Sequence, residues 1–284
     1  MFPSVFTDTL LRWVLQAGAV VSALVMAMIM LFLLSESWPV LQHLSLAQFL
    51  TDSSWHPLEG SYNLTPMLSG TLFASMGALL LAVPLGIASA IFIVYYASSW
   101  SALLYRRLIE LLAGIPSVVF GFWGLTTLVP LVNQLHPPGA SLLAGILVLT
   151  LMILPTIALM TYAALIAVPD EYIRSAAALG LSGWSMIRGV ALPAARTGIV
   201  AGIVLAAGRA LGETMAVLMV AGNVVQHADS LFDPIRTLAA NIALEMAYAM
   251  GDHRAVLFVS GLMLMLLVMT LSGLAGWLGK KSYA

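Results

Sequence analysis

The sequence predicts an all-α integral membrane protein with six transmembrane helices, and three observations support that fold class. Of the 284 residues, 61% are hydrophobic and 8% are charged, whereas a soluble domain carries about 25% charged residues. The apolar residues gather in six runs, each as long as the roughly 20 residues that a helix needs to cross a bilayer. The runs are continuous and lack the polar–apolar alternation of transmembrane barrels. We place the spans near residues 13–34, 67–96, 108–132, 142–168, 198–222 and 255–278.

The first run, near 13–34, is interpreted as a retained helix and not as a cleaved leader. It is longer than the roughly 7–15 residues of a signal-peptide core, and no A-x-A-like cleavage site follows it. The polar segment that comes next, 35–66, is too short to fold as a domain of its own. Its tryptophans, Trp38 and Trp55, are residues typical of a membrane interface. We therefore treat residues 1–66 as one N-terminal unit, a helix with an outer segment.

The distribution of basic residues predicts the orientation of the chain. Short cytoplasmic loops of membrane proteins are enriched in Lys and Arg. One side of the predicted topology carries only Arg236 and Arg254, so the opposite side, with both termini and the loop at 168–193, is expected in the cytoplasm. The basic residues on that side are Arg12, Arg106, Arg107, Arg174, Arg188, Arg196, Lys280 and Lys281.

Composition and motifs argue against several other classes of protein. A net charge of -1 does not suit a nucleic-acid binder, and without cysteines there is no disulfide or thiolate metal site. The five histidines are scattered without metal-ligand spacing, which indicates exposed loop residues. The string nearest to an ATP-binding phosphate loop, 276–282, has Lys281 where Ser or Thr is required. We therefore expect neither an enzyme nor a bound cofactor or metal.

The cytoplasmic loop at 168–193 predicts two short helices. Pro169 suits the first helical position, and Glu171 lies in the first turn, where the helix dipole favours an acid. Gly180 is placed to take a left-handed conformation after the first helix. Ser182 is a good cap for a second helix.

Pro193 is expected to end that second helix. Two helices joined by a tight turn, small on one face and aromatic on the other, are typical of a docking element. An ordinary amphipathic loop at the membrane surface has the same pattern. The residues alone leave both interpretations open.

Two charges lie inside the fifth run, Arg209 and Glu213. A charge at the centre of a membrane helix costs roughly 2.5–3.5 kcal/mol on insertion scales. Residues four apart share a helix face, so a self-satisfied ion pair is one interpretation. The other is a path for an anion, because Arg offers planar donors that match phosphate oxygens. Gly208 and Gly212 leave room for a neighbouring helix.

A third acidic residue, Glu110, lies near the inner end of the third run. Its default partner is Arg106 or Arg107, three or four residues away on the same helix. The alternative is that it lines the inner mouth of a transport path.

Four stretches resemble a known family. Alanines at 176–178 before Gly180, followed by Ile187 and a Leu-Pro pair at 192–193, are similar to the "EAA" loop of ABC importer permeases. The stretches GIPSVVFGFWGLTTLVP at 114–130 and GRALGETMAVLMVAGN at 208–223 narrow the resemblance to PstC-type permease subunits of phosphate-specific importers. FLTDSSWHPLEGSYNLTPML at 49–68 is similar to the outer segment of those subunits.

The resemblance implies a fold, a location and partners. The fold would be the type I ABC importer permease (MetI-like) fold, with a permease domain at 67–280 and a coupling loop at 168–193, in a bacterial inner membrane. The partners would be the lipid bilayer, a second PstA-like permease, a cytoplasmic PstB-like ATPase dimer and a periplasmic PstS-like phosphate-binding protein, with no nucleic acid. The subunit would translocate inorganic phosphate, while ATP is hydrolysed on the ATPase chain.

The resemblance also implies roles for particular residues, with one departure from the family pattern. The phosphate path would involve Arg209 and Glu213, and Glu110 would belong to it only if it lines the inner mouth. The ATPase coupling loop would involve Glu171, Arg174, Ala176, Ala177 and Gly180. The family usually has Glu six residues before the loop glycine, where this chain has Arg174, with Ser175 in place of a common Ala. One interpretation is that Glu171, on roughly the same helical face, substitutes for the missing acid; the alternative is a complementary change in the ATPase of this importer.

Three alternative functions remain open from the sequence. A permease for another oxyanion, such as molybdate or sulfate, would carry the same anion-compatible residues. The second alternative is a secondary transporter that needs no ATPase. An inverted repeat between the two halves would favour it, and we find no such repeat. A phosphate-sensing membrane subunit would keep gene regulation after loss of uptake.

Overall fold

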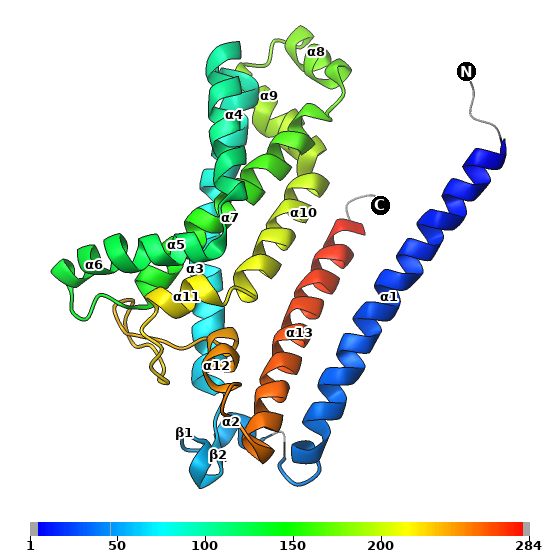
Figure 1. The fold of residues 1–284 in the computed structure, drawn as a ribbon. Coiled ribbons are helices and arrows are strands. Elements are labelled where there is room, and N and C mark those ends of the chain that lie inside the picture. Colours follow the sequence, from blue (N-terminus) through cyan, green and yellow to red (C-terminus); the bar gives the residue numbers. More distant parts are fainter. Residues whose placement is uncertain (1–4, 46, 281–284) are drawn as a thin grey trace.

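The computed structural model describes the backbone of residues 5–45 and 47–280 and the side chains of 11–45 and 47–273 (Figure 1). Lys281 and the first four residues of the predicted unit 1–66 lie outside the described residues, as does the side chain of Lys280. The described chain is almost entirely helical, with one two-stranded hairpin. The α-helices are α1 Val5–Leu41, α2 Gln48–Thr51, α3 Thr65–Ile91, α4 Ser99–Gly114, α5 Ser117–Trp123, α6 Val129–Leu135, α7 Leu142–Ile166, α8 Asp170–Ala178, α9 Gly183–Met186, α10 Leu192–Leu211, α11 Met215–Val220, α12 Leu238–Glu245 and α13 Gly251–Lys280.

Short π-helical turns extend or join several of these helices, and a 3-10 turn joins the two strands. A π-helical turn follows α3 at Phe92–Tyr96, another joins α5 to α6 at Gly124–Leu128, and a third joins α9 to α10 at Ile187–Ala191. The hairpin consists of β1 Trp55–His56 and β2 Ser61–Tyr62, joined by the 3-10 turn Pro57–Glu59. Trp55 pairs with Tyr62 in an antiparallel register.

Six segments are long and apolar enough to cross a membrane within the described residues, which confirms the predicted number of spans. Three of them, in α3, α7 and α10, form the centre of the molecule. Small residues bring these helices close together, since a Cβ on Gly86 of α3 would lie 2.8 Å from Ile157 of α7, and one on Gly202 of α10 would lie 2.6 Å from Met160 of α7. Such small-residue contacts are typical of packing between membrane helices.

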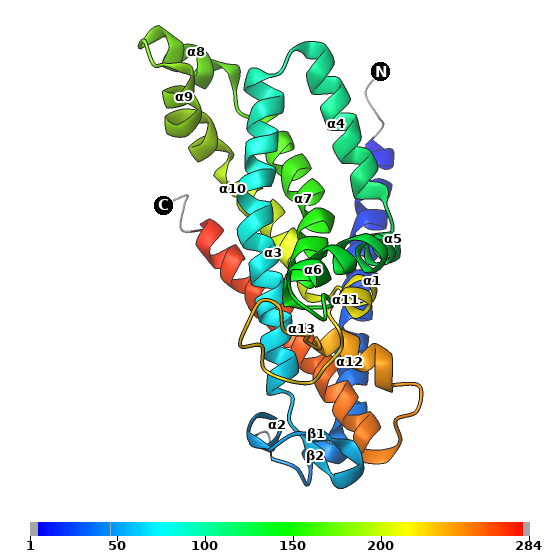
Figure 2. The same cartoon turned by 90° about the vertical axis from the view of Figure 1, so that its left-hand side faces the viewer.

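Helix α1 lies apart from this centre and contacts α13 at the end of the molecule opposite α8 (Figures 1 and 2). Phe32 packs edge-to-face against Phe258, with ring centroids 5.6 Å apart. Most of α1 exposes large apolar side chains. In a membrane protein such a surface suits lipid or another helix.

The third predicted span is not one straight helix. Ile115 and Pro116 have extended backbones between α4 and α5. In Figure 1, α4 runs along the length of the molecule, whereas α5 and α6 extend sideways from its end. The span near 108–132 is therefore interrupted at Pro116, because proline removes a backbone donor and disfavours helix at the residue before it.

The end of the molecule opposite α8 is closed by the hairpin together with α2 and α12 (Figure 2). Trp55 is 8% exposed and Tyr62 is 6% exposed, and both pack in a core with residues of α3, α12 and α13. Burial, with a smaller contribution from the negative charge of Asp252, raises the pKa of Tyr62. Trp55 is thus buried within the protein, whereas Trp38 is exposed.

Candidate functional site

The fifth predicted span is broken at residues 212–214. Helix α10 ends at Leu211, and α11 starts at Met215 and runs across the direction of α10 in Figure 1. The prediction of a continuous span near 198–222 is wrong, because apolar content does not report backbone continuity and Gly212 and Thr214 are weak helix formers. Broken helices occur at membrane depth where the backbone is buried in protein or lines a cavity.

Arg209 precedes the break, whereas Glu213 lies within it. Arg209 is in the last turn of α10, where the helix dipole favours a cation. The Oε1 atom of Glu213 accepts a hydrogen bond from the backbone N–H of Ala216 at 3.0 Å, so it caps the start of α11. The expectation that both charges share one helix face is wrong, since the helix ends between them.

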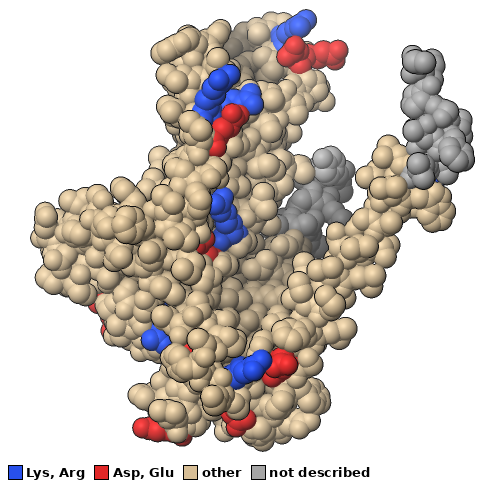
Figure 3. Space-filling view, viewed as in Figure 1, with Lys and Arg blue, Asp and Glu red and all other residues tan. Residues whose placement is uncertain are grey.

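Arg209 has no ion pair or hydrogen bond among the side chains and backbone that the structure describes. It is half-buried. Figure 3 shows a small group of basic and acidic atoms at mid-height, separate from the charged groups at the two ends of the molecule. A charge within an apolar span without a counter-ion is costly, and the guanidinium donors of Arg209 are available for an anion.

Helix α5 fixes the position of α11 by close packing. A Cβ on Gly121 would lie 2.8 Å from both the Cα of Ala216 and the sulfur of Met219. A Cβ on Gly124 would lie 2.8 Å from Val220, near the other end of α11. The stretches 114–130 and 208–223, both singled out from the sequence, therefore pack against each other next to the helix break.

Glu110 lies away from this break, on α4. Its Oε1 accepts a hydrogen bond from Nε of Arg106 at 2.7 Å, and the two side chains are about equally exposed. Arg106 also donates to the hydroxyl of Tyr162 at 3.2 Å and lies over its ring. The hydrogen bonds to Glu110 and Tyr162 raise the pKa of Arg106. The structure thus pairs Glu110 with Arg106, its default partner, and Arg106 in turn connects α4 to Tyr162 of α7.

The cytoplasmic loop forms two short helices, as predicted. Gly180 has φ of 78° and follows α8, and the side chain of Ser182 accepts a hydrogen bond from the N–H of Ser185 at the start of α9. Pro169 is the cap residue and not the first helical residue. The expectation that Pro193 ends the second helix is wrong. The π-helical turn at Ile187–Ala191 widens the helix before the proline, and α10 continues through it.

The predicted coupling residues lie at the extreme end of the molecule, on or just after α8 (Figure 1). Ala176 is 3% exposed and anchors α8. The other four are exposed, and they are Glu171, Arg174, Ala177 and Gly180. Arg174 reaches Asp170 at 3.5 Å, but with side chains 80% and 84% exposed this pair contributes little to stability.

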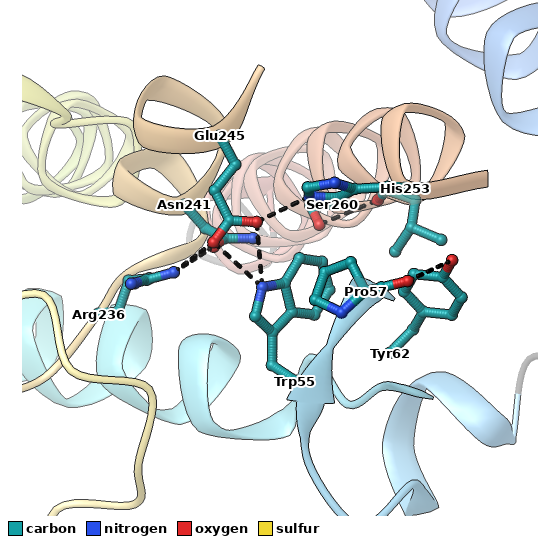
Figure 4. A network of polar contacts seen from close by, with 9 residues as sticks. Trp55, Pro57, Tyr62, Arg236, Asn241, Glu245, His253 and Ser260 are labelled. Carbon is teal, nitrogen blue, oxygen red and sulfur yellow. Dashed lines mark hydrogen bonds and ion pairs between the residues drawn. The ribbon is translucent and has the colours of Figure 1, made fainter. Parts of the chain in front are cut away.

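A second polar cluster, which the sequence did not indicate, surrounds Glu245 at the end of α12 (Figure 4). Its side chain is 9% exposed and contacts NH1 of Arg236 at 2.6 Å and Nε2 of His253 at 2.8 Å. The indole N–H of Trp55 donates to both carboxylate oxygens, at 3.2 and 3.1 Å. The interpretation of all five histidines as exposed loop residues is therefore wrong for His253, whose side chain is 14% exposed.

The fold and the loop geometry define a class of membrane transport protein, and comparisons with known sequences agree. Residues 82–282 match the family described as "Binding-protein-dependent transport system inner membrane component", and the chain belongs to this family. It is a multi-pass membrane protein of the ABC importer permease class.

Within that family the chain belongs to the PstC group. It is 34% identical over 96% of its length to the "Phosphate transport system permease protein PstC" of Mesorhizobium japonicum, of which it covers 90%.

Solved structures with the same fold have low sequence identity. A bacterial ABC transporter for import of the acidic polysaccharide alginate matches with a TM-score of 0.68 and 14% identity, covering 98% of this chain and 99% of that one. The inward-facing MetNI methionine ABC transporter matches with a TM-score of 0.58 and 21% identity, covering 77% of this chain and 94% of that one. The predicted type I, MetI-like permease fold is confirmed.

Proposed function

We propose that this chain is the permease subunit of an ATP-driven ABC importer that carries inorganic phosphate into the cytoplasm. One observation carries the proposal: Arg209 lies at a break within an apolar span and has no partner in the described part of the chain. Its planar guanidinium matches phosphate oxygens in geometry and charge. The name of the Mesorhizobium japonicum relative, which refers to phosphate transport, supports phosphate as the anion.

Glu213 has a complementary role in this proposal. Its carboxylate accepts a hydrogen bond from the N–H of Ala216, which holds it at the start of α11. A negative charge near the anion path prevents the arginine from becoming a permanent trap, so the anion binds and leaves. Glu110, already paired with Arg106, is proposed to border the inner mouth and not to contact the anion.

The partners follow from the two ends of the molecule. At one end, α8, α9 and the turn between them expose large apolar side chains, which suits docking on a PstB-like ATPase dimer; they are Tyr172, Leu179, Leu181 and Trp184. ATP would be hydrolysed on those chains and not on this one. The excess of basic residues toward the α8 end supports cytoplasmic termini in a bacterial inner membrane. A PstA-like permease would complete the path, and a periplasmic PstS-like protein would deliver phosphate.

Uptake of radiolabelled phosphate tests this function directly. The chain is expressed with its presumed partners in cells that lack their own high-affinity phosphate permease. We expect energised phosphate uptake that excess unlabelled phosphate suppresses and that excess sulfate or molybdate does not. An assembled complex without phosphate uptake would contradict the proposal, and suppression by molybdate or sulfate would assign the path to another oxyanion.

A further inference from the structure

The cluster around Glu245 joins the hairpin at Trp55 to three neighbouring segments of the chain between residues 236 and 253. The carboxylate belongs to α12, while its partners Trp55, Arg236 and His253 come from β1, the segment before α12 and α13 (Figure 4). Because each partner is a donor, both oxygens of the carboxylate are used. Burying a charge lowers the free energy of unfolding unless the charge is fully paired. A well-packed apolar residue at such a site is often equally or more stabilising. The arrangement therefore favours a fixed geometry over maximum stability.

Arg236 extends the cluster to the outer end of α11. Its Nε donates to the backbone oxygen of Asn223 at 2.9 Å, and its NH1 donates to the side-chain oxygen of Asn241 at 3.0 Å. Asn223 has φ of 57°, and its side-chain amide donates to the oxygen of Leu218 in α11 at 2.7 Å. One guanidinium thus holds the end of α11 against α12.

The same short helix begins at the break beside Glu213. Helix α11 has six residues, so its two ends are about 9 Å apart at 1.5 Å per residue. Because α11 is this short, we expect it to move as a rigid unit, so a displacement of Arg236 at one end of α11 would shift the break at its other end. In the opposite direction, the indole of Trp55 connects Glu245 to the hairpin, whose tip residue Leu58 is fully exposed.

We propose that Glu245 is a positioning residue that couples the outer hairpin at residues 55–62 to the helix break at 212–214. A substrate-binding protein that contacts the exposed tip of the hairpin would act on Trp55, through Glu245 and Arg236, on α11. This inference rests on the proposed function for the identity of the arriving partner. The link between hairpin and α11 itself rests only on the contacts of Glu245, Arg236 and Asn223.

The distance between the hairpin tip and the end of α11 tests that link without any substrate. The chain has no cysteines, so spin labels at Leu58→Cys and Val224→Cys report one distance in the assembled complex. We expect a narrow distribution in the otherwise native chain and a broadened one in Glu245→Gln, which keeps the shape of the side chain and removes its charge. Trp55→Phe, which loses the two indole hydrogen bonds and part of the ring packing but keeps the carboxylate paired with Arg236, broadens it less. An unchanged distribution in both variants would overturn the proposal.

Stimulation of ATPase activity by loaded binding protein separates coupling from mere stability. In reconstituted complexes, Glu245→Gln lowers the maximal stimulation by about fivefold, within the range for residues that modulate coupling between sites. The basal rate and the half-maximal concentration of binding protein stay at their native values. Basal and stimulated rates that fall together would assign Glu245 a structural role only. The matched control is Glu36→Gln, which removes an acid from the same end that is 3.9 Å from Arg254 in an exposed pair.

A wild-type complex that phosphate-loaded binding protein does not stimulate would contradict the proposed function. The spin-label distances still decide the role of Glu245 in that case.

Discussion

Two charged regions of this molecule solve the problem of a charge in an apolar surrounding in opposite ways. At Glu245 the carboxylate has a full set of donors, at 2.6 to 3.2 Å, from three other segments. At the break in the fifth span, Glu213 is satisfied by the backbone, whereas Arg209 has no partner in the part of the chain that the structure describes. A charge that is fully paired holds the protein together. A charge left without a partner inside a span is available to a ligand.

The largest expected effect is a loss of stability when the paired carboxylate of Glu245 is removed. Glu245→Ala leaves the buried Arg236 without its counter-ion, and breaking one side of a buried ion pair costs about 3–5 kcal/mol. Arg209→Ala removes a charge that has no described partner, so the stability of the folded complex stays the same or rises slightly. Thermal unfolding of the two purified complexes measures the difference. Equal destabilisation by both variants would mean that Arg209 is also a structural charge.

An intermediate effect on stability and uptake is expected when the packing of α5 against α11, next to the helix break, is disturbed. Gly121→Ala places a Cβ 2.8 Å from the Cα of Ala216, and such overpacking typically costs about 1–3 kcal/mol. We expect lower thermal stability and reduced phosphate uptake, because α5 moves away from α11. Gly114→Ala is the matched control, since its Cβ would meet nothing within 4 Å. If both variants behave like the native chain, packing between α5 and α11 does not position the break.

The smallest effect on stability is expected at the exposed loop. Arg174→Glu replaces the pair with Asp170 by two like charges, which at the surface of a helix changes stability by about 0.5 kcal/mol or less. If Arg174 contacts the ATPase, stimulated ATPase activity falls while thermal stability does not. Asp170→Asn removes the same ion pair and keeps Arg174, so it should leave that activity unchanged. A loss of activity in Asp170→Asn as well would assign the effect to the helix and not to a partner.

Much of the fold could be predicted because the membrane imposes simple rules. Six apolar runs gave six spans, and the turn chemistry of Gly180 and Ser182 gave the two helices of the loop. Continuity was mispredicted at 212–214. Hydropathy averages over a window and does not register a Gly-Glu-Thr triplet that redirects the backbone.

The contact of Trp55 with the Glu245 cluster could not be predicted from the sequence, since only the tertiary fold brings these two residues together. Trp55 and Glu245 are 190 positions apart. Each residue of the cluster has an ordinary local explanation, an interfacial tryptophan or a loop histidine. In contrast, Arg209 and Glu213 stood out because charges are rare inside apolar spans, although their separation by a helix break was not apparent.

Uptake by Arg209 variants tests the central claim most directly. Radiolabelled phosphate uptake is measured for the native chain, Arg209→Gln and Arg209→Lys in assembled complexes, with Arg107→Gln as a control that removes an exposed positive charge from α4. Arg209→Gln is expected to lower uptake about 10- to 100-fold, since a hydrogen bond to a charged group contributes about 1.5–3 kcal/mol. Arg209→Lys should retain part of the uptake, because it keeps the charge without the planar donors. Native uptake in Arg209→Gln, with normal assembly, would contradict the account.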